Sequence, residues 1–275
     1  MLSLDTILFQ ALEMKAYDDW RGELASLENL NLRITKNPKG NLAKKLIEAD
    51  SNWSHYNFDQ KHEILEILSH EICHIFKIRP VGIFNLKNYN TFCKEHGLTE
   101  ILHEFDKNCY GFYAYHKAAG VEYMNIVFPD ESKLSSLPFL DVLNTLFHEL
   151  GHAIIDEQMR KIENKIKEQG YAGWNNIENY LSEDFLENLE SVGFLKFYEL
   201  RNKKMRRAKT SAFRNMIENY DAKNDTYTNE NAYHKFIMSW EERCAEYLGR
   251  TGASIIYDAL VQIGHTPQAI ENTEN

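Results

Sequence analysis

Proline, glycine and cysteine are all scarce in this chain of 275 residues, which has five prolines, thirteen glycines and four cysteines. So few helix breakers argue against a fold built from many short strands and turns. The cysteines do not form the framework of a small disulfide-rich domain, because they are few and scattered in a chain long enough to build a core. We therefore expect reduced thiols at Cys73, Cys93, Cys109 and Cys244.

Long apolar runs and an excess of positive charge are also missing. No stretch of 18 apolar residues occurs, and residues 1–10 lack the basic and apolar regions of a signal peptide. We expect a soluble protein that is cytoplasmic by default, or exported without a conventional signal peptide. The formal charge of -10 argues against nucleic acid as a partner, because phosphate binding needs a cationic surface. The basic run at 201–209 is an exception that we interpret as a solvated helix face.

Apolar residues recur at three and four positions over most of the chain, so helix should dominate. Strand signals are few, and the clearest is an aromatic-rich hairpin of 110–116 and 121–128. A shorter strand is expected at 81–86. These patterns predict an α+β fold that is mostly helical, with a small mixed or antiparallel sheet before the helix at 138–160. The expected helices are 3–18, 41–50, 58–77, 90–106, 138–160, 174–200, 231–249 and 253–263.

The same patterns suggest how the chain is divided. Residues 1–57 form an N-terminal helical region, and residues 58–265 form the main domain. Within it, residues from about 160 to 230 are charged, helical and without a strand signal, so we interpret them as a helical insertion. The polar residues 266–275 are expected to be a tail.

One helix carries residues that can bind a metal. His148 and His152 are four residues apart, so on a helix both imidazoles can reach one ion. Glu149 then points toward the open coordination position, where it can take a proton from metal-bound water. At 100° per residue both histidines fall on a stripe without lysine or arginine, and the opposite side is apolar. Gly151 leaves room for another backbone to pass close.

A second helix repeats the same spacing with His70, Glu71 and His74. There the histidines fall in a wide polar arc, which is typical of a solvent face, while Glu71 falls in the apolar arc. We take the motif at 148 as the catalytic one and keep His70 and His74, with Glu71 as base, as an alternative metal site. A structural zinc site that adds Cys73, Cys93, His96 or Cys109 to these histidines would follow no usual spacing.

Two histidines leave a catalytic zinc one protein ligand short, so the hypothesis needs a later His, Asp or Glu. No histidine or aspartate follows six residues after His152. The helical segment 239–247 places Glu242 and Glu246 one turn apart on one face, and Glu241 is the next choice of ligand. The alternative is that these glutamates are ordinary surface charges.

These motifs resemble the gluzincins, a family of zincin metallopeptidases in which a glutamate on a later helix completes the zinc site. The Glu-x-x-Ala-Glu form of 242–246 is most similar to the lethal-factor type of bacterial toxin peptidase. The resemblance implies a zincin-like fold, a Zn²⁺ cofactor, Glu242 as third ligand and Glu246 as the carboxylate that orients a zinc histidine. It also implies that strand 121–128 is the edge strand that pairs with a peptide substrate.

We therefore expect a zinc-dependent endopeptidase that acts on a protein or peptide. A tyrosine or histidine would stabilise the oxyanion, and Tyr227, Tyr233 and His234 precede Glu242 closely enough to be candidates. Asp156, one turn beyond His152, is a further candidate to orient a ligand. Two other interpretations stay open, namely an inert zincin scaffold that only binds, and a helical interaction protein with chance motifs. The resemblance also suggests a secreted effector.

Overall fold

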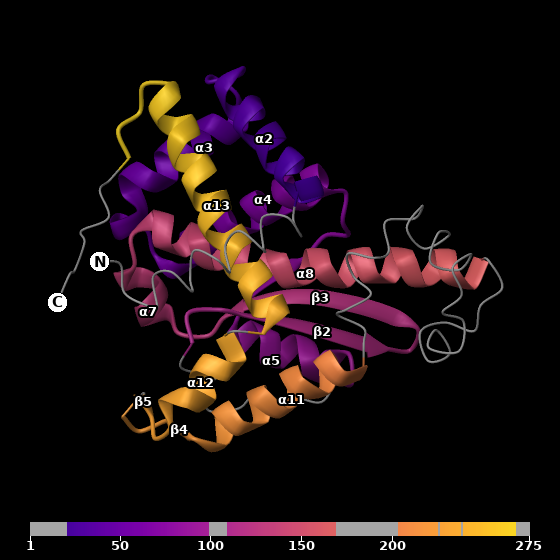
Figure 1. Ribbon diagram of the computed structural model, residues 1–275. Coiled ribbons are helices and arrows are strands. Elements are labelled where there is room, and N and C mark those ends of the chain that lie inside the picture. The colour runs from indigo at the N-terminus through magenta and orange to yellow at the C-terminus, as the bar shows by residue number, and fades with distance from the viewer. Residues whose placement is uncertain (1–20, 99–108, 169–202, 225, 238, 268–275) are drawn as a thin grey trace, which may run out of the picture. The chain divides into compact units, whose positions relative to one another are not determined.

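The computed structural model describes residues 21–98, 109–168, 203–224, 226–237 and 239–267. The chain is mostly helical with a small mixed sheet, so the α+β class is confirmed. It divides into two compact units, of which the first is Met1–Ala153 with Cys244–Asn275 and the second is Ile154–Arg243. The boundary passes through two long helices, α8 (Phe139–Glu168) and α13 (Trp240–Gln262), both drawn in Figure 1.

The first unit opens with helices that pack through their apolar faces. They are α2 (Arg21–Thr35), α3 (Asn41–Asn52), the short 3-10 helix η1 (Trp53–His55) and α4 (Phe58–Phe76). The expected helix at 58–77 begins with a capping box, in which Asn57 and Gln60 each accept a bond from the other's backbone N–H at 3.0 Å. Helix α2 was not predicted. Both α2 and α3 pack on α4, so the region before residue 57 shares a core with the start of the main domain.

The sheet has three strands in the order β1-β3-β2. Strands β2 (Phe112–Ala118) and β3 (Val121–Phe128) form the predicted hairpin, and β1 (Gly82–Asn85) is the predicted shorter strand. The hairpin loop is Ala119 and Gly120, both with positive φ, at 50° and 80°. Two such residues make a tight turn whose twist matches that of the strands.

The prediction that strand 121–128 lies at the edge of the sheet is wrong. Strand β3 is central, because its second half pairs in parallel with β1 while residues 121–127 pair antiparallel with β2. The parallel partner is only four residues long and is distant in sequence, so no local signal shows where it pairs. In the described sheet the strand that lies at the edge on the hairpin side is β2.

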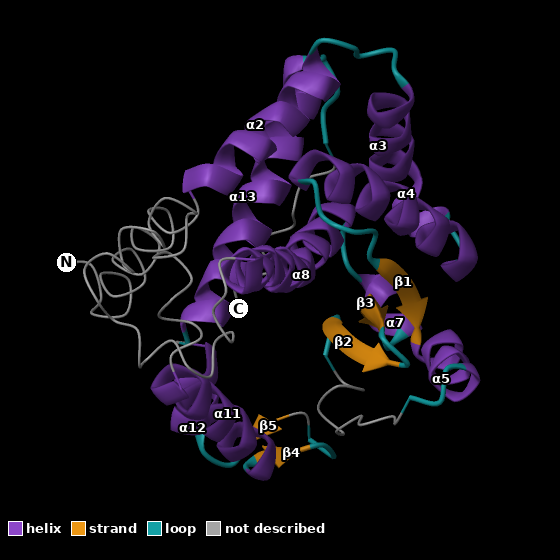
Figure 2. Ribbon diagram, turned by 90° about the vertical axis from the view of Figure 1, so that its right-hand side faces the viewer, coloured by secondary structure: helices purple, strands orange, loops and turns teal. Residues whose placement is uncertain are grey.

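Helices cover both faces of the sheet (Figure 2). Helix α5 (Leu86–Glu95) covers one face, where its Tyr89 and Cys93 form a buried cluster with Val127, against which Phe112 packs. It begins earlier than the helix expected at 90–106, since Asn85 caps it by accepting from the N–H of Asn88, and it ends at Glu95. Residues 99–106 of that prediction lie outside the described residues. Helix α8 approaches the other face.

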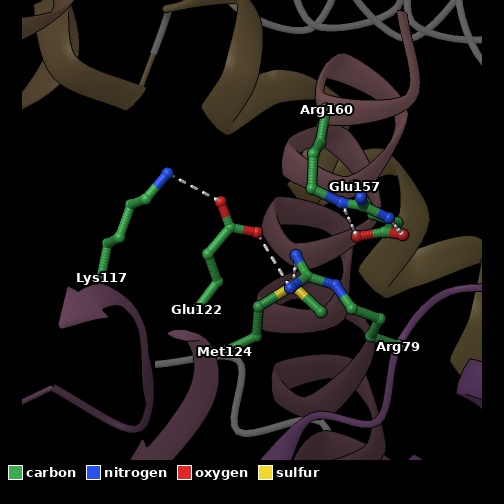
Figure 3. Close-up of polar contacts among 6 residues, drawn as sticks. All are labelled: Arg79, Lys117, Glu122, Met124, Glu157 and Arg160. Atoms are coloured by element: carbon green, nitrogen blue, oxygen red, sulfur yellow. Dashed lines mark hydrogen bonds and ion pairs between the residues drawn. The ribbon is translucent and has the colours of Figure 1, made fainter. Parts of the chain in front are cut away.

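A polar cluster lies at the turn end of that hairpin (Figure 3). Glu122 accepts from Arg79 at 3.0 Å and from Lys117 at 3.4 Å, and Arg79 also contacts the sulfur of Met124 at 4.0 Å. Burial opposes ionisation of Glu122, but hydrogen bonds from Tyr115 and Lys117 outweigh it, so the pKa of this carboxyl is lowered. Through Glu122 the cluster links β3 to Lys117 of β2 and to Arg79, which precedes β1.

The C-terminal helices divide at a different place from the one predicted. We expected 231–249 and 253–263, but the structure has α12 (Glu230–Ile237) and then α13, which runs unbroken through Gly249 and Gly252. These glycines permit a close helix crossing and do not end the helix. Helix α13 ends at Gln262 and is followed by Gly264 (φ 85°), where the N–H groups of 264 and 265 bond to the carbonyls of 261 and 260.

Helix α7 (Glu131–Ser136) precedes α8 and begins at Asp130, whose carboxylate accepts from the N–H groups of Ser132 and Lys133. In the second unit, α8 carries a bidentate pair in which Arg160 donates to the buried Glu157 at 3.0 and 2.5 Å (Figure 3).

The second unit also contains α11 (Lys203–Glu218), which bears most of the basic run, and a short hairpin of β4 (Tyr220–Asp221) and β5 (Thr226–Tyr227). This hairpin lies within the segment for which no strand was expected. Helix α12 packs on α11, with the rings of Phe213 and Phe236 5.4 Å apart.

Some of the sequence predictions lie outside the described residues. They are the helices at 3–18 and 174–200, residues 169–202 of the expected insertion and most of the tail at 266–275. Among the helices that are described, none is both long enough and apolar enough to cross a membrane.

Candidate metal centre

Helix α8 carries the stripe that the sequence predicts. Its apolar side is buried, with Val142, Leu143, Leu146, Phe147 and Leu150 each 0% exposed. On the opposite stripe, Thr145 and His148 are half-buried, and Glu149 and His152 are only 7% and 8% exposed. Burial raises the pKa of Asp141, which lies on the same stripe two turns before His148. The stripe is therefore sheltered as well as polar.

Helix α13 crosses α8 (Figure 1). Small residues of the two helices face each other where they cross. A Cβ on Gly151 would lie 3.0 Å from the Cα of Ala245, so the predicted close approach of another backbone at Gly151 is confirmed. A Cβ on Gly249 would lie 2.6 Å from Asn144 and 3.2 Å from His148, and one on Gly252 would meet the Phe147 ring at 2.4 Å.

The crossing brings the N-terminal turn of α13 to the histidines. His148, His152 and Glu242 each offer one ligand atom, and these three atoms all lie within 4.8 Å of one another. Glu242 is 9% exposed and lies on the same continuous helix as Ala245. Among the described residues, these three side chains form a group that could hold a metal ion.

Glu246 lies one turn further along α13 and contacts the first histidine. His148 Nδ1 is 3.3 Å from Glu246 Oε2, and Arg250 Nε donates to Glu246 Oε1 at 2.6 Å. The hydrogen bond with His148, and behind it the one from Arg250, lowers the pKa of Glu246 to about 2. Glu246 thus stays a carboxylate, able to accept the Nδ1 proton and leave Nε2 to bind a metal.

Gly111, just before β2, and Tyr113, within it, also reach α8, and neither was singled out from the sequence. A Cβ on Gly111 would lie 2.9 Å from Thr145 and 3.6 Å from the Cγ of Glu149. The ring of Tyr113 stacks on that of His152, with centroids 6.3 Å apart and 15° between the planes. The aromatic run at 110–116 was visible as a strand, but its contact with the histidine depends on tertiary packing.

The alternative motif on α4 has a different environment. His70 and His74 are exposed, and Glu71 accepts an ion pair from Arg33 of α2 at 2.8 Å. Arg33 accounts for the glutamate in the apolar arc, because α2 covers this side of α4. Cys73 of the same motif is buried, and burial raises the pKa of its thiol, which disfavours the thiolate that metals bind.

The other cysteines considered for a structural zinc site form no disulfide. Cys93 is 0% exposed in the core beneath α5, Cys109 is half-buried, and His96 stacks on Phe92 with centroids 4.3 Å apart.

The remaining candidates lie in the second unit. Tyr227 and Tyr233 stack with ring centroids 4.6 Å apart, and Tyr220 packs on Tyr227 at 5.4 Å. His234 is exposed on α12 beside Tyr233, and Asp156 is half-buried on α8 one turn after His152. Glu241, the next choice of ligand, is half-buried on the first turn of α13.

Comparison with known proteins adds no relative to this picture. No family model matches the chain, and searches of curated proteins and of solved structures also found no match.

Proposed function

We propose that the chain is a zinc-dependent endopeptidase whose metal centre is formed by His148, His152 and Glu242. The observation that carries this proposal is the gathering of two imidazoles and one carboxylate within 4.8 Å, beside the buried Glu149. Glu149 is not needed to bind a metal, but it is the residue that hydrolysis needs. Its place next to the ligands favours an enzyme over an inert scaffold.

The donor set suits zinc. Catalytic zinc sites in proteins take three protein ligands from His, Glu, Asp and Cys and keep a fourth position open for water. Two imidazoles and one carboxylate supply one negative charge to a dication, and the predicted stripe adds no lysine or arginine that would repel it. When bound, zinc supplies Lewis acidity, which lowers the pKa of water and polarises a carbonyl.

The residues of this chain then have separate tasks. Glu149 takes a proton from the attacking water and delivers it to the leaving amine, because it lies on the helical turn between the two histidines. Glu246 accepts the Nδ1 proton of His148 across 3.3 Å, which leaves the other ring nitrogen to bind the metal. Its own position is fixed by Arg250.

The substrate is proposed to be an extended segment of a protein. In place of strand 121–128, strand β2 lies at the edge of the described sheet on the hairpin side, and Gly111 just before it and Tyr113 within it lie against α8. A peptide that pairs with β2 would run past Glu149. Tyr227, Tyr233 and His234 stay candidates for the group that stabilises the oxyanion.

The test is the zinc content of purified protein, measured by elemental analysis together with cleavage of a mixed peptide library. Wild-type protein and His70→Ala are expected to hold about one zinc per chain, whereas His148→Ala and Glu242→Ala are expected to lose it. Glu149→Gln should keep the zinc and lose cleavage by a factor of about 10² or more. A His70→Ala protein that loses its zinc, together with a His148→Ala protein that keeps it, would contradict the proposed ligands.

Two outcomes separate the rival interpretations. A wild-type protein that binds zinc but cleaves nothing in the library would favour a scaffold that only binds. A wild-type protein that binds no zinc would favour a helical interaction protein in which both motifs are accidental. Cleavage that survives Glu149→Gln would remove Glu149 from the mechanism.

A further inference from the structure

Strand β2 presents alternate side chains to opposite faces of the sheet. Phe112 and Ala114 pack into the cluster beneath α5. Tyr113, between them, therefore points to the face that α8 approaches, and there its ring lies against His152. Tyr113 is thus a residue of the sheet that contacts a proposed metal ligand.

The geometry of the rings restricts His152 in two directions. Its imidazole lies nearly parallel to the Tyr113 ring, at 15°, and crosses the His148 ring at 72° with centroids 5.2 Å apart. Offset-stacked and edge-to-face arrangements are the two that aromatic pairs prefer. His152 is also 8% exposed, so few other rotamers are open to it. An imidazole binds a metal in its own plane, and whatever fixes that plane fixes the direction of the donor nitrogen.

The contact exists because β2 begins close to α8. Gly111 lies on the same side of the strand as Tyr113, and a Cβ there would lie 2.9 Å from Thr145 Cγ2 and 3.6 Å from Glu149 Cγ. A larger residue at this position would require at least the Thr145 side chain to shift. Thr145, Glu149 and His152 follow each other along one stripe of α8, and β2 runs over them from Gly111 to Tyr113.

We propose that Tyr113 is a positioning residue, whose ring holds the imidazole of His152 in the plane that the metal requires. The inference rests on the metal centre proposed above. The aromatic face carries out this role and the hydroxyl does not. The loss of Tyr113 is therefore expected to act on the metal through His152.

The experiment compares variants of the full chain by zinc affinity, measured in competition with a chromophoric chelator, and by the visible absorption of Co²⁺ in place of zinc. Tyr113→Leu is expected to weaken zinc binding about 10-fold to 100-fold, the range for residues that orient metal ligands. It should also change the Co²⁺ spectrum. Tyr113→Phe, which keeps the ring, should bind zinc within about twofold of wild type and keep the Co²⁺ spectrum.

Tyr115→Leu is the matched control. Tyr115 lies two residues along on the same side of β2, is 41% exposed and bonds to Glu122, so its loss should leave zinc affinity unchanged. Tyr113→Thr is a second variant without a ring and has high strand propensity, in case Tyr113→Leu does not fold. Unfolding midpoints of all variants in the metal-free state show whether a weaker affinity reflects a damaged fold.

Three results would overturn the inference. Zinc affinity and Co²⁺ spectrum unchanged in the ring-less variants would show that the ring does not position His152. A Tyr113→Phe protein as weak as Tyr113→Leu would assign the effect to the hydroxyl. A wild-type protein that binds no zinc would overturn the proposed function and this role together. If wild type and Tyr113→Leu bind zinc equally well, only the role of Tyr113 is overturned.

Discussion

His148 Nδ1 lies 3.3 Å from Glu246 Oε2, so the carboxylate of one helix contacts the first histidine of the other. The same carboxylate receives Arg250 at 2.6 Å on its second oxygen. Glu246 therefore links a proposed metal ligand to a fixed positive charge, and its two oxygens have different partners. This relationship leads to the first two predictions.

Glu246→Gln should weaken zinc binding about 10-fold to 100-fold, because the amide is a poorer acceptor for the imidazole proton than the carboxylate. Glu242→Gln should weaken it much further, since a proposed ligand is lost. The matched control is Glu241→Gln on the same turn, which should bind zinc as wild type does. The measurement is competition with a chelator, and equal loss in the Glu241 and Glu242 variants would contradict the assignment of the ligand.

Glu246 should also shape acid stability in the metal-free protein. The pKa of this carboxyl falls from its ordinary 4.5 to about 2, so the folded state favours the charged form. A lowered pKa contributes stability that is complete above pH 4.5 and is lost as pH falls toward 2. Urea unfolding of wild type and Glu246→Gln at a series of pH values should show a difference that shrinks across this window. A constant difference would contradict the role of ionisation.

Gly252→Ala should destabilise the fold although alanine is the better helix former. Its Cβ would lie 2.4 Å from Cγ of Phe147, whose side chain is fully buried and has no space to move. Overpacking of this kind costs about 1–3 kcal/mol. The measurement is the free energy of unfolding in urea, with Ser254→Ala on the exposed side of the same helix as control. A more stable Gly252→Ala protein would show that the crossing is looser than described.

His265→Ala should loosen the end of α13. His265 Nε2 lies 2.7 Å from the Oδ2 of Asp50, a residue of α3 that is 2% exposed, so this pair joins the C-terminal end of the chain to α3. Loss of one hydrogen bond to a buried charged group costs about 1.5–3 kcal/mol. Thermal unfolding should show the loss, while Thr266→Ala, an exposed neighbour, should unfold as wild type does. A His265→Ala protein of unchanged stability would contradict this.

Local pattern was enough for much of this fold. The apolar side of α8, the hairpin of β2 and β3 and the capped helix α4 all follow from spacing and turn residues. The features that the sequence did not predict depend on distant partners. The parallel pairing of β1 with β3 makes β3 central, and Arg33 accounts for Glu71 only once α2 is known to pack on α4.

The candidate site shows the same division. The spacing of His148 and His152 is local, so the helix alone puts them on one side. Glu242 came from resemblance to a family, and its approach to the histidines depends on the crossing at Gly151. The contact of Tyr113 with His152 depends on how the sheet is seated on α8, which strand alternation alone does not give. Gly249 and Gly252 led to the prediction of two helices in place of α13, because the residues that they pack against lie on another helix and are not visible in the local sequence.

The crossing at Gly151 also affects how well the chain can tolerate insertions and deletions between α8 and α13. Because Gly151 touches Ala245, the segment 154–243 leaves the first unit and returns to it at neighbouring points. Each doubling of such a loop adds only about 0.6 kcal/mol of closure entropy. Insertions and deletions between α8 and α13 should therefore be tolerated, and the surroundings of the histidines can diversify while the pair itself stays in place.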